Sequence, residues 1–336
     1  MQNIKSVLTT SIIIVSLIIP LIGICLLYDP NIKFEITNYI ISITIFTIYQ
    51  SFLSALISLI IGSIFAYYLK KNSEVGIIKL IVNILSILFV MPTIIIVLGM
   101  LTFFNSFTDI YGPFGIVFCH VILNLPLATR IIYQSLNDIS GNEYILAEQM
   151  GLKKFETFLA TEWQIIKKNA PSLFALIFFI CFVSFTPVLI LGGSPKYSTI
   201  EVSIYQSVVF LNNYNTAFYL LILQLLICSI IFFLTFKNFK SENFFLDDRK
   251  IHIKNEIHFR NKLTDYSVII FISLTLFISP IAIFFRGINL KFFEVFRSNY
   301  FLSSLSDTFL ICFGSGILSL LFTLNILQIL DKSKKS

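Results

Sequence analysis

The sequence predicts an all-α protein, a polytopic membrane helical bundle with eight spans and with both termini in the cytoplasm. Of its 336 residues, 57% are hydrophobic and only 12% are charged, whereas about a quarter of the residues are charged in average soluble proteins. Long apolar segments also recur along the chain, and basic residues gather in alternate connections between them. Charge sidedness across a lipid bilayer therefore explains the net charge of +6 better than nucleic-acid binding does, and no nucleic-acid partner is expected.

Each apolar segment is long enough, at about 1.5 Å per residue, to cross a hydrocarbon core of about 30 Å. The first resembles a signal-peptide core but lacks a small-residue cleavage pattern after it, so it is expected to remain as an anchor. The third is interrupted by Met91, Pro92 and Thr93. The predicted spans are Ile12–Leu27, Ile43–Leu69, Ile77–Phe104, Phe114–Ile132, Ser172–Leu191, Ala217–Phe236, Ser267–Phe285 and Asp307–Leu330.

The distribution of lysine and arginine predicts which connections lie in the cytoplasm. With the N-terminus inside, only five basic residues fall outside, and the other 19 of the 24 lie in or beside inside connections. The five are Lys33, Lys196, Arg286, Lys291 and Arg297. Because basic residues are enriched in cytoplasmic loops, this orientation is preferred. It places Lys237–Asp265 inside and Gly192–Asn215 outside.

An internal repeat predicts the domain organisation. The segment 17–24 is echoed by 277–284, and 54–62 by 315–323, with offsets of 260 and 261 residues. We therefore expect a six-span unit over 1–236 with a polar loop at 134–171, a linker over 237–265, and the first two spans of a second, incomplete unit over 266–336. Thr323 and Asn325 in the last span are expected to need neighbouring helices.

The motifs of several chemistries are absent, so the chain is not expected to be an enzyme. The five cysteines lie in apolar spans without a C-x-x-C pair, and the three histidines have no metal-ligand spacing. There is no P-loop sequence for binding a nucleotide. We therefore expect no metal site, no cofactor and no catalytic residue.

The central polar stretch, Asn142–Phe155, separates apolar segments on either side. Gly151 within it predicts a break between two short helices, because glycine ends a helix in the left-handed conformation at little steric cost. Beyond the break, apolar residues recur at helical spacing as far as Trp163. The pattern is typical of a helix-turn-helix at a membrane surface, and an ordinary amphipathic helix resting on lipid headgroups remains open.

This stretch resembles the EAA loop of bacterial ABC-transporter permeases. Ala147 and Gly151 fall on the second Ala and the Gly of that pattern, while Ile145 and Leu146 replace its Glu and first Ala, and the closing Pro is lost. The flanking segments 120–130, 181–195 and 198–206 are similar to those of the thiamine (thiamine pyrophosphate) permeases of that superfamily.

The resemblance implies a permease subunit in the bacterial inner membrane, importing thiamine or thiamine pyrophosphate. A cytosolic ABC ATPase dimer would dock on the loop, and a periplasmic substrate-binding protein would deliver the substrate. The implied coupling residues are Ala147, Gly151, Glu162 and Trp163. The implied translocation path is lined by Asn124, Pro126, Ser184 and Thr186.

Alternatives remain open for these residues. Asn124 and His120 are functional candidates because they are polar and lie in a membrane segment. Interhelical hydrogen bonding is an equal alternative, and it is the one expected for His120. Ser184 and Thr186 could instead bond carbonyls one turn earlier in their own helix.

Other functions also remain open. The same fold could import another solute, such as ferric iron. An ion-coupled secondary transporter and an intramembrane enzyme belong to other classes, and the spans contain few of the charged residues that a coupled carrier needs. Because family members carry two fused six-span halves, the resemblance implies as a further partner a second permease half or another copy of the chain. A non-functional remnant is the remaining possibility.

Overall fold

The computed structural model describes residues 37–104, 107–193, 195–236, 259–288 and 292–335, with six single positions nearer the N-terminus. Every regular element in these ranges is a helix. The predicted span Ile12–Leu27 lies outside the described residues, apart from those six positions. The chain divides into two compact units, Phe34–Phe285 on the one hand and Met1–Lys33 with Arg286–Ser336 on the other.

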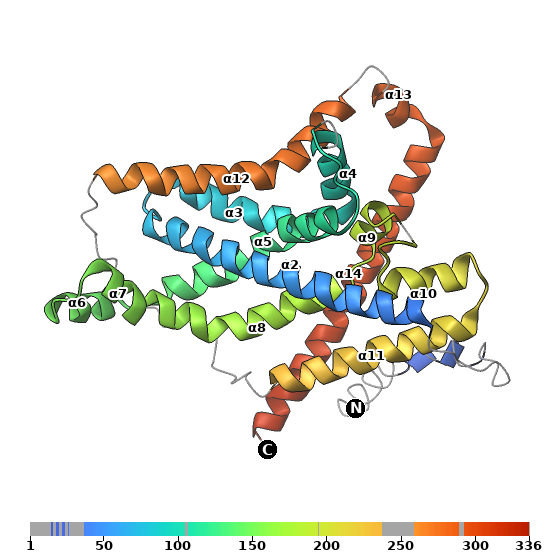
Figure 1. Cartoon of the computed structure of the whole chain (residues 1–336), viewed down its shortest axis with the longest axis horizontal. Helices are drawn as coiled ribbons and strands as arrows, with labels where there is room; N and C mark the ends of the chain where they lie inside the picture. Colours follow the sequence, from blue (N-terminus) through green and yellow to red (C-terminus); the bar gives the residue numbers. More distant parts are fainter. Residues whose placement is uncertain are drawn as a thin grey trace. The chain divides into compact units, whose positions relative to one another are not determined.

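Long apolar helices form the larger unit (Figure 1). They are α2 (Asn38–Lys71), α5 (Pro113–Asn137), α8 (Glu162–Phe182), α11 (Tyr214–Phe236) and α12 (Phe259–Gly287). Together with α14 of the smaller unit, they give six helices in the described ranges that are long and apolar enough to cross a membrane. The predicted spans at 43–69, 114–132, 217–236, 267–285 and 307–330 are thus confirmed as apolar helices of sufficient length, and each helix continues into its flanking residues.

The helices α2 and α5 pack closely because α2 carries a small residue at every turn. Ser54, Ser58, Gly62 and Ala66 are all buried, and a Cβ atom on Gly62 would lie only 2.6 Å from that of Ala128 on α5. Small residues of this kind let two membrane helices approach each other without a separating side chain. The opposite face of α2 exposes Ile45, Tyr49 and other large apolar side chains.

The predicted interruption at Met91–Thr93 is confirmed as a sharp bend. The helices α3 (Gly76–Val90) and α4 (Thr93–Phe104) meet at 103°. Pro92 has no N–H group to donate to α3, so α3 ends before it. The carbonyl of Pro92 accepts from Ile95 N at 2.9 Å in the first turn of α4. The pair counts as a seventh candidate span only if both helices together form a bent one.

The predicted span Ser172–Leu191 differs from the structure at both ends. The helix α8 begins at Glu162, passes through Pro171 and ends at Phe182, and a separate short helix, α9 (Thr186–Leu191), follows. Pro187 stands in the first turn of α9, where a missing N–H group costs nothing. The expected outer connection Gly192–Asn215 likewise contains a helix, α10 (Ile200–Val209).

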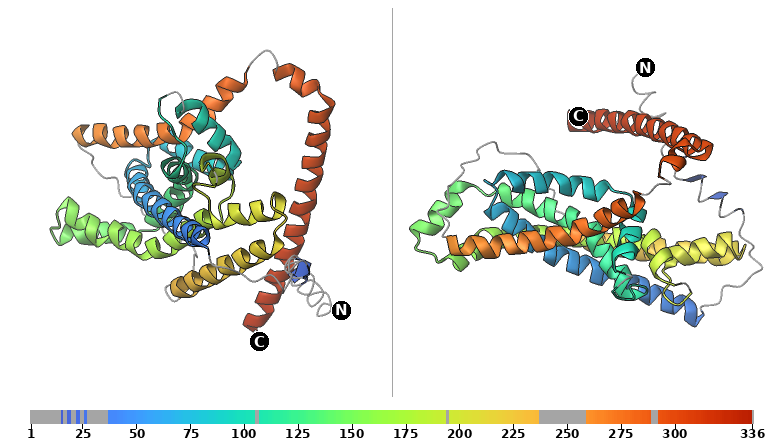
Figure 2. Two further views of the ribbon diagram at one scale, coloured as in Figure 1. Left: turned by 45° about the vertical axis from the view of Figure 1, so that its right-hand side comes forward. Right: turned by 90° about the horizontal axis from the view of Figure 1, so that it is seen from above.

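The helix α12 packs into the larger unit although it follows the linker in sequence (Figure 2). Its first seven residues were expected to belong to that linker. Ile269, Ile272 and Leu276 of α12 are buried in the same core as residues of α3, α4 and α5. A Cβ atom on Gly99 of α4 would lie 2.1 Å from the carbonyl oxygen of Ser279, so the two helices touch through their backbones.

The smaller unit contains α13 (Phe292–Arg297) and α14 (Asn299–Lys335). Thr323 and Asn325 of α14 were expected to need neighbouring helices. Their side chains donate to the carbonyls of Ser319 and Leu321 on α14 itself, at 2.8 and 2.7 Å. Back-bonding one turn earlier along the helix thus gives each side chain one hydrogen bond within α14.

Candidate functional site

The central polar stretch forms two short helices joined at Gly151, as predicted. They are α6 (Gly141–Gln149) and α7 (Lys154–Ala160). Gly151 has a φ of +71°, its N–H group donates to Glu148 O at 2.9 Å, and Leu152 N donates to Ala147 O at 3.1 Å. These two bonds form a Schellman motif, which ends a helix in a defined geometry. The turn between α6 and α7 is therefore well specified by its backbone.

A polar network fastens this loop to two long helices. Tyr144 on α6 donates its hydroxyl proton to Glu162 Oε1, with an O···O distance of 2.9 Å. Lys70 Nζ, near the end of α2, donates to the same Tyr144 hydroxyl and lies 4.0 Å from Glu162 Oε1. Thr161 Oγ1 donates to the other carboxylate oxygen of Glu162. The side chains of Lys70 and Glu162 are only 18% and 12% exposed.

The neighbouring aromatic side chains make a second connection between α2 and the loop. The rings of Tyr67 on α2 and Phe158 on α7 meet edge to face, with their centroids 5.1 Å apart. Phe158 also lies beside Trp163 at the start of α8, with centroids 6.5 Å apart. Edge-to-face pairs of this kind stabilise a contact beyond the area that they bury.

The outer surface of the loop exposes several large apolar side chains among charged and polar ones. Met150 and Phe155 are 74% and 70% exposed, on either side of the Gly151 turn. Other large apolar side chains exposed on the two helices are those of Ile145, Leu146 and Leu159. An exposed apolar patch on a polar connection is typical of a contact surface for another protein or for lipid.

The four predicted coupling residues therefore occupy different environments. Ala147 is buried, Glu162 is nearly buried in the polar network, Trp163 is partly exposed, and Gly151 is exposed. Lys70 and Tyr144 were missed by the sequence reasoning. Lys70 was explained by the enrichment of basic residues in cytoplasmic connections. Nothing in the sequence around Tyr144 indicates that it contacts a residue 74 positions away.

Two of the predicted path residues bond to Cys181 of α8, Asn124 through its side chain and Ser184 only through its backbone N–H group. Asn124 Nδ2 donates to Cys181 Sγ at 3.3 Å and to His120 O at 2.8 Å. The Ser184 N–H group donates to Cys181 O at 3.3 Å. Gln50 on α2 donates its amide to the same carbonyl at 3.0 Å, so three elements converge there. Gln50 was also missed, although a lone glutamine in an apolar segment is itself a signal.

The other three span residues singled out in the sequence are His120 and Pro126 of α5 and Thr186 of α9. His120 was expected to bond a neighbouring helix, but neither of its ring nitrogens has a hydrogen-bond partner in the described part of the chain. Pro126 is buried inside α5. Thr186 is the first residue of α9 and is partly exposed.

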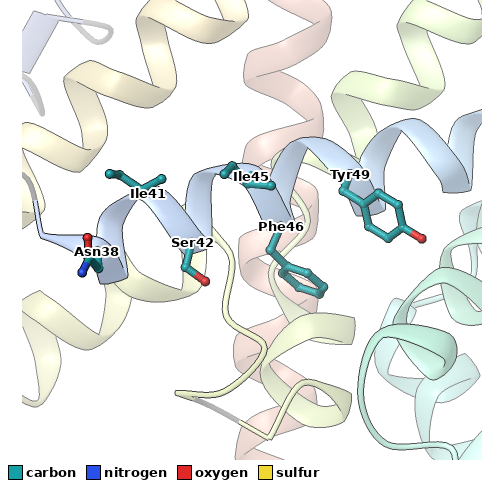
Figure 3. Close-up of a pocket in the computed structure, with 6 residues that line it drawn as sticks. All are labelled: Asn38, Ile41, Ser42, Ile45, Phe46 and Tyr49. Carbon is teal, nitrogen blue, oxygen red and sulfur yellow. The ribbon is translucent and has the colours of Figure 1, made fainter.

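A groove of about 470 Å³ follows the outer face of α2 (Figure 3). In Figure 3, Phe46 and Ser42 point to one side of the helix, and Ile41 and Ile45 point to the other. The remaining residues that line it are Asn38 and Tyr49. The lining contains two aromatic rings and no charged side chain, and all of it belongs to α2, so the groove is a shallow, open and largely apolar face of one helix.

Comparisons with known proteins agree with the motif assignment. No family model matches the chain. Over 213 residues it is 32% identical to the thiamine transport system permease protein ThiP of Haemophilus influenzae. This match covers 59% of the present chain and 39% of that relative. Over 315 residues it is 28% identical to ThiP of Escherichia coli, covering 86% of this chain and 57% of that relative. The chain thus spans about half the length of the curated relatives that it matches. The chain is therefore similar in sequence to thiamine transport permease proteins, the similarity that its motifs predicted.

Proposed function

We propose that the chain is the membrane-spanning permease subunit of a binding-protein-dependent ABC importer for thiamine or thiamine pyrophosphate in a bacterial inner membrane. The observation that carries this proposal is the α6–Gly151–α7 turn. It combines an exposed apolar surface with a base that is hydrogen-bonded to α2 and α8. Such a loop can receive a force from a bound protein and pass it to the membrane helices.

The partner at this surface would be one subunit of a cytosolic ABC ATPase dimer. Met150, Phe155 and Leu146 supply an apolar contact, and Glu148 and Lys153 supply charges of both signs beside it. The Schellman geometry at Gly151 keeps the turn from deforming under load. This assignment places α6 and α7 in the cytoplasm, in agreement with the basic residues around them.

On the opposite side, a periplasmic substrate-binding protein would meet the connection between α9 and α11. That connection contains α10, and Tyr39 at the start of α2 is joined to Ser203 of α10, with 3.1 Å between their hydroxyl oxygens. The groove on α2 begins at the adjacent residue Asn38. Thiamine is an aromatic cation, and the rings of Phe46 and Tyr49 are suited to such a group. The path residues Asn124, Pro126, Ser184 and Thr186 remain proposals for positions deeper in the bundle.

The domain organisation belongs to the same proposal. Residues 1–236 would form one six-span unit, 237–265 a cytoplasmic linker, and 266–336 the first two spans of a second unit. A second permease half or another copy of the chain is the further partner in this proposal. The repeat offset and the length of the relatives support this arrangement.

Uptake of labelled thiamine tests the proposal. The full chain is expressed with the ATPase and binding protein of a thiamine importer in a host that cannot take up thiamine. We expect the chain to retain the ATPase during purification, and uptake to be lost or severely weakened unless a second membrane polypeptide is present. Near-normal uptake with the chain alone would contradict the need for a second half.

The competing functions give other results in the same host. Uptake that depends on an ion gradient and needs no ATPase would favour a secondary transporter. Uptake of ferric iron in place of thiamine, with the ATPase still required, would favour an importer of the same fold with another substrate. Absence of both ATPase binding and uptake, with and without added membrane polypeptides, would indicate a non-functional remnant.

A further inference from the structure

We propose that Lys70, Tyr144 and Glu162 form a polar clamp that joins α6 to the ends of α2 and α8, so that a displacement of the α6–α7 loop moves both helices together. This proposal rests on the proposed function, because it assigns a role within the coupling of ATP hydrolysis to transport. The clamp consists of these three side chains, one from each element.

The need for a clamp follows from how the chain is connected. The loop is continuous in sequence with α5 through residues 138–140 and with α8 through Thr161. It has no such link to α2, which ends at Lys71, well before the loop in sequence. Yet α2 packs along both α5 and α8 through its buried small residues. Only side-chain contacts can therefore carry a movement of the loop directly to the end of α2.

The chemistry of the three groups suits a permanent connection. The Tyr144 hydroxyl accepts from the Lys70 ammonium and donates to the Glu162 carboxylate, so both of its hydrogen bonds involve a charged group and are stronger than neutral ones. The 4.0 Å between Lys70 Nζ and Glu162 Oε1 is too long for a direct hydrogen bond. The tyrosine hydroxyl therefore bridges the two charges.

Burial keeps this bridge closed. Burial and the nearby Glu162 carboxylate raise the pKa of Tyr144, so its hydroxyl stays protonated and remains a donor. Opening the bridge would leave charged groups of Lys70 and Glu162 with little water around them, which is costly. The contact of Tyr67 with Phe158 holds α7 against α2 in the same region, so both loop helices are attached to the last two turns of α2.

The variant Tyr144→Phe tests the clamp because it removes the hydroxyl and retains the ring. We expect the chain, together with its second membrane polypeptide, to keep its ATPase during purification. Uptake per ATP hydrolysed should fall by about tenfold or more, because the lost bonds are to charged groups. Lys70→Met should behave in the same way, and Lys70→Arg should retain most of the coupling.

A matched control is Asp265→Asn, at the same end of α2. It removes the charge of a carboxylate that is paired with Lys71 of α2, but it leaves the loop untouched. We expect uptake per ATP to stay at the wild-type value in this variant. A wild-type ratio in Tyr144→Phe, or an equal loss in Asp265→Asn, would overturn the clamp.

A second measurement needs neither ATPase nor substrate. Trp163 is the only tryptophan of the chain and lies next to Glu162, so its fluorescence reports on the base of the loop. In the purified full chain, Tyr144→Phe should make Trp163 more accessible to acrylamide quenching, and Asp265→Asn should not. If the wild-type chain binds no ATPase, the proposed function fails while this measurement still decides on the clamp. Unchanged quenching in Tyr144→Phe would then refute it.

Discussion

Gly62 on α2 faces Ala128 on α5 so closely that a Cβ atom at position 62 would lie 2.6 Å from the alanine Cβ and 3.2 Å from Thr129 N. Backbone cannot retreat from such a contact without moving a whole helix, so the pair fixes the separation of α2 and α5. Ser58 and Ser54, one and two turns earlier along α2, are fully buried.

Overpacking this contact should destabilise the larger unit. We expect Gly62→Val to lower the free energy of unfolding by about 1–3 kcal/mol, because the added side chain has no space to enter. The thermal unfolding midpoint of the detergent-solubilised chain measures the effect. Gly76→Ala is the control, since a Cβ atom there meets nothing within 4 Å. Equal midpoints for the two variants would show that α2 and α5 can separate easily.

The ion pair between α2 and α12 should respond asymmetrically to removal of its two members. Lys71 Nζ lies 2.8 and 3.0 Å from the two carboxylate oxygens of Asp265, and the lysine is 29% exposed whereas the aspartate is 2% exposed. We expect Lys71→Leu to cost about 3 kcal/mol, because it leaves a buried carboxylate unpaired. Asp265→Leu should cost about 1 kcal/mol or less, because the freed lysine can extend into water.

The double variant of this pair provides the check on the reasoning. Lys71→Leu with Asp265→Leu should be more stable than Lys71→Leu alone, because no charge is left buried. Thermal unfolding of the four chains gives the comparison. Equal losses from the two single variants would contradict the asymmetry.

Replacing Gly151 by a β-branched residue should be unfavourable because of the backbone conformation at this position, not because of steric contacts. Its φ is +71°, and a Cβ atom would meet nothing within 4 Å. Gly151→Val should strain the turn by about 1–2 kcal/mol and reduce the amount of ATPase that copurifies, while Gly151→Asn should be tolerated better. Gly193→Val is the matched control, because Gly193 also has a positive φ, of +59°, and free space around it. Equal ATPase retention in Gly151→Val and Gly193→Val would remove the turn from the coupling role.

The orientation in the membrane can be read from thiol labelling. Ser198, within the connection expected outside, is 1% exposed and is unsuitable as a labelling position. Leu211 and Met150 are both well exposed. In a chain without its native cysteines, an impermeant thiol reagent should label Leu211→Cys in intact spheroplasts, and Met150→Cys only after permeabilisation. The reverse pattern would invert the proposed orientation.

Local features of the sequence predicted the positions of most helices. They also predicted the two helix breaks that each follow from a single residue, Pro92 and Gly151. Pro92 lacks a donor and Gly151 accepts a positive φ, so each signals its break without knowledge of the fold. The end of α8 at Phe182 was missed, because Ser184 and Thr186 beyond it are small polar residues that can bond carbonyls one turn earlier in a continuing helix.

Contacts between distant residues could not be predicted in the same way. In a membrane helix, the face toward lipid and the face toward a neighbouring helix are both apolar, so periodicity does not reveal which partner a face meets. The candidate site was accordingly predicted in part. Glu162 was included through the motif, whereas its partners Lys70 and Tyr144 depend on the packing of α2 against the loop.

The backbone contact between Gly99 and Ser279 also bears on the order in which the chain is made. Because α12 follows the linker, the ribosome must complete roughly another 180 residues after Gly99 before Ser279 can be laid against it. During that interval, the surface of α4 that receives α12 has to be sheltered by lipid or by the insertion machinery. Assembly of the larger unit is therefore not finished when its first helices have been inserted. A nascent chain arrested in the linker would leave uncovered the face of α4 that packs against α12.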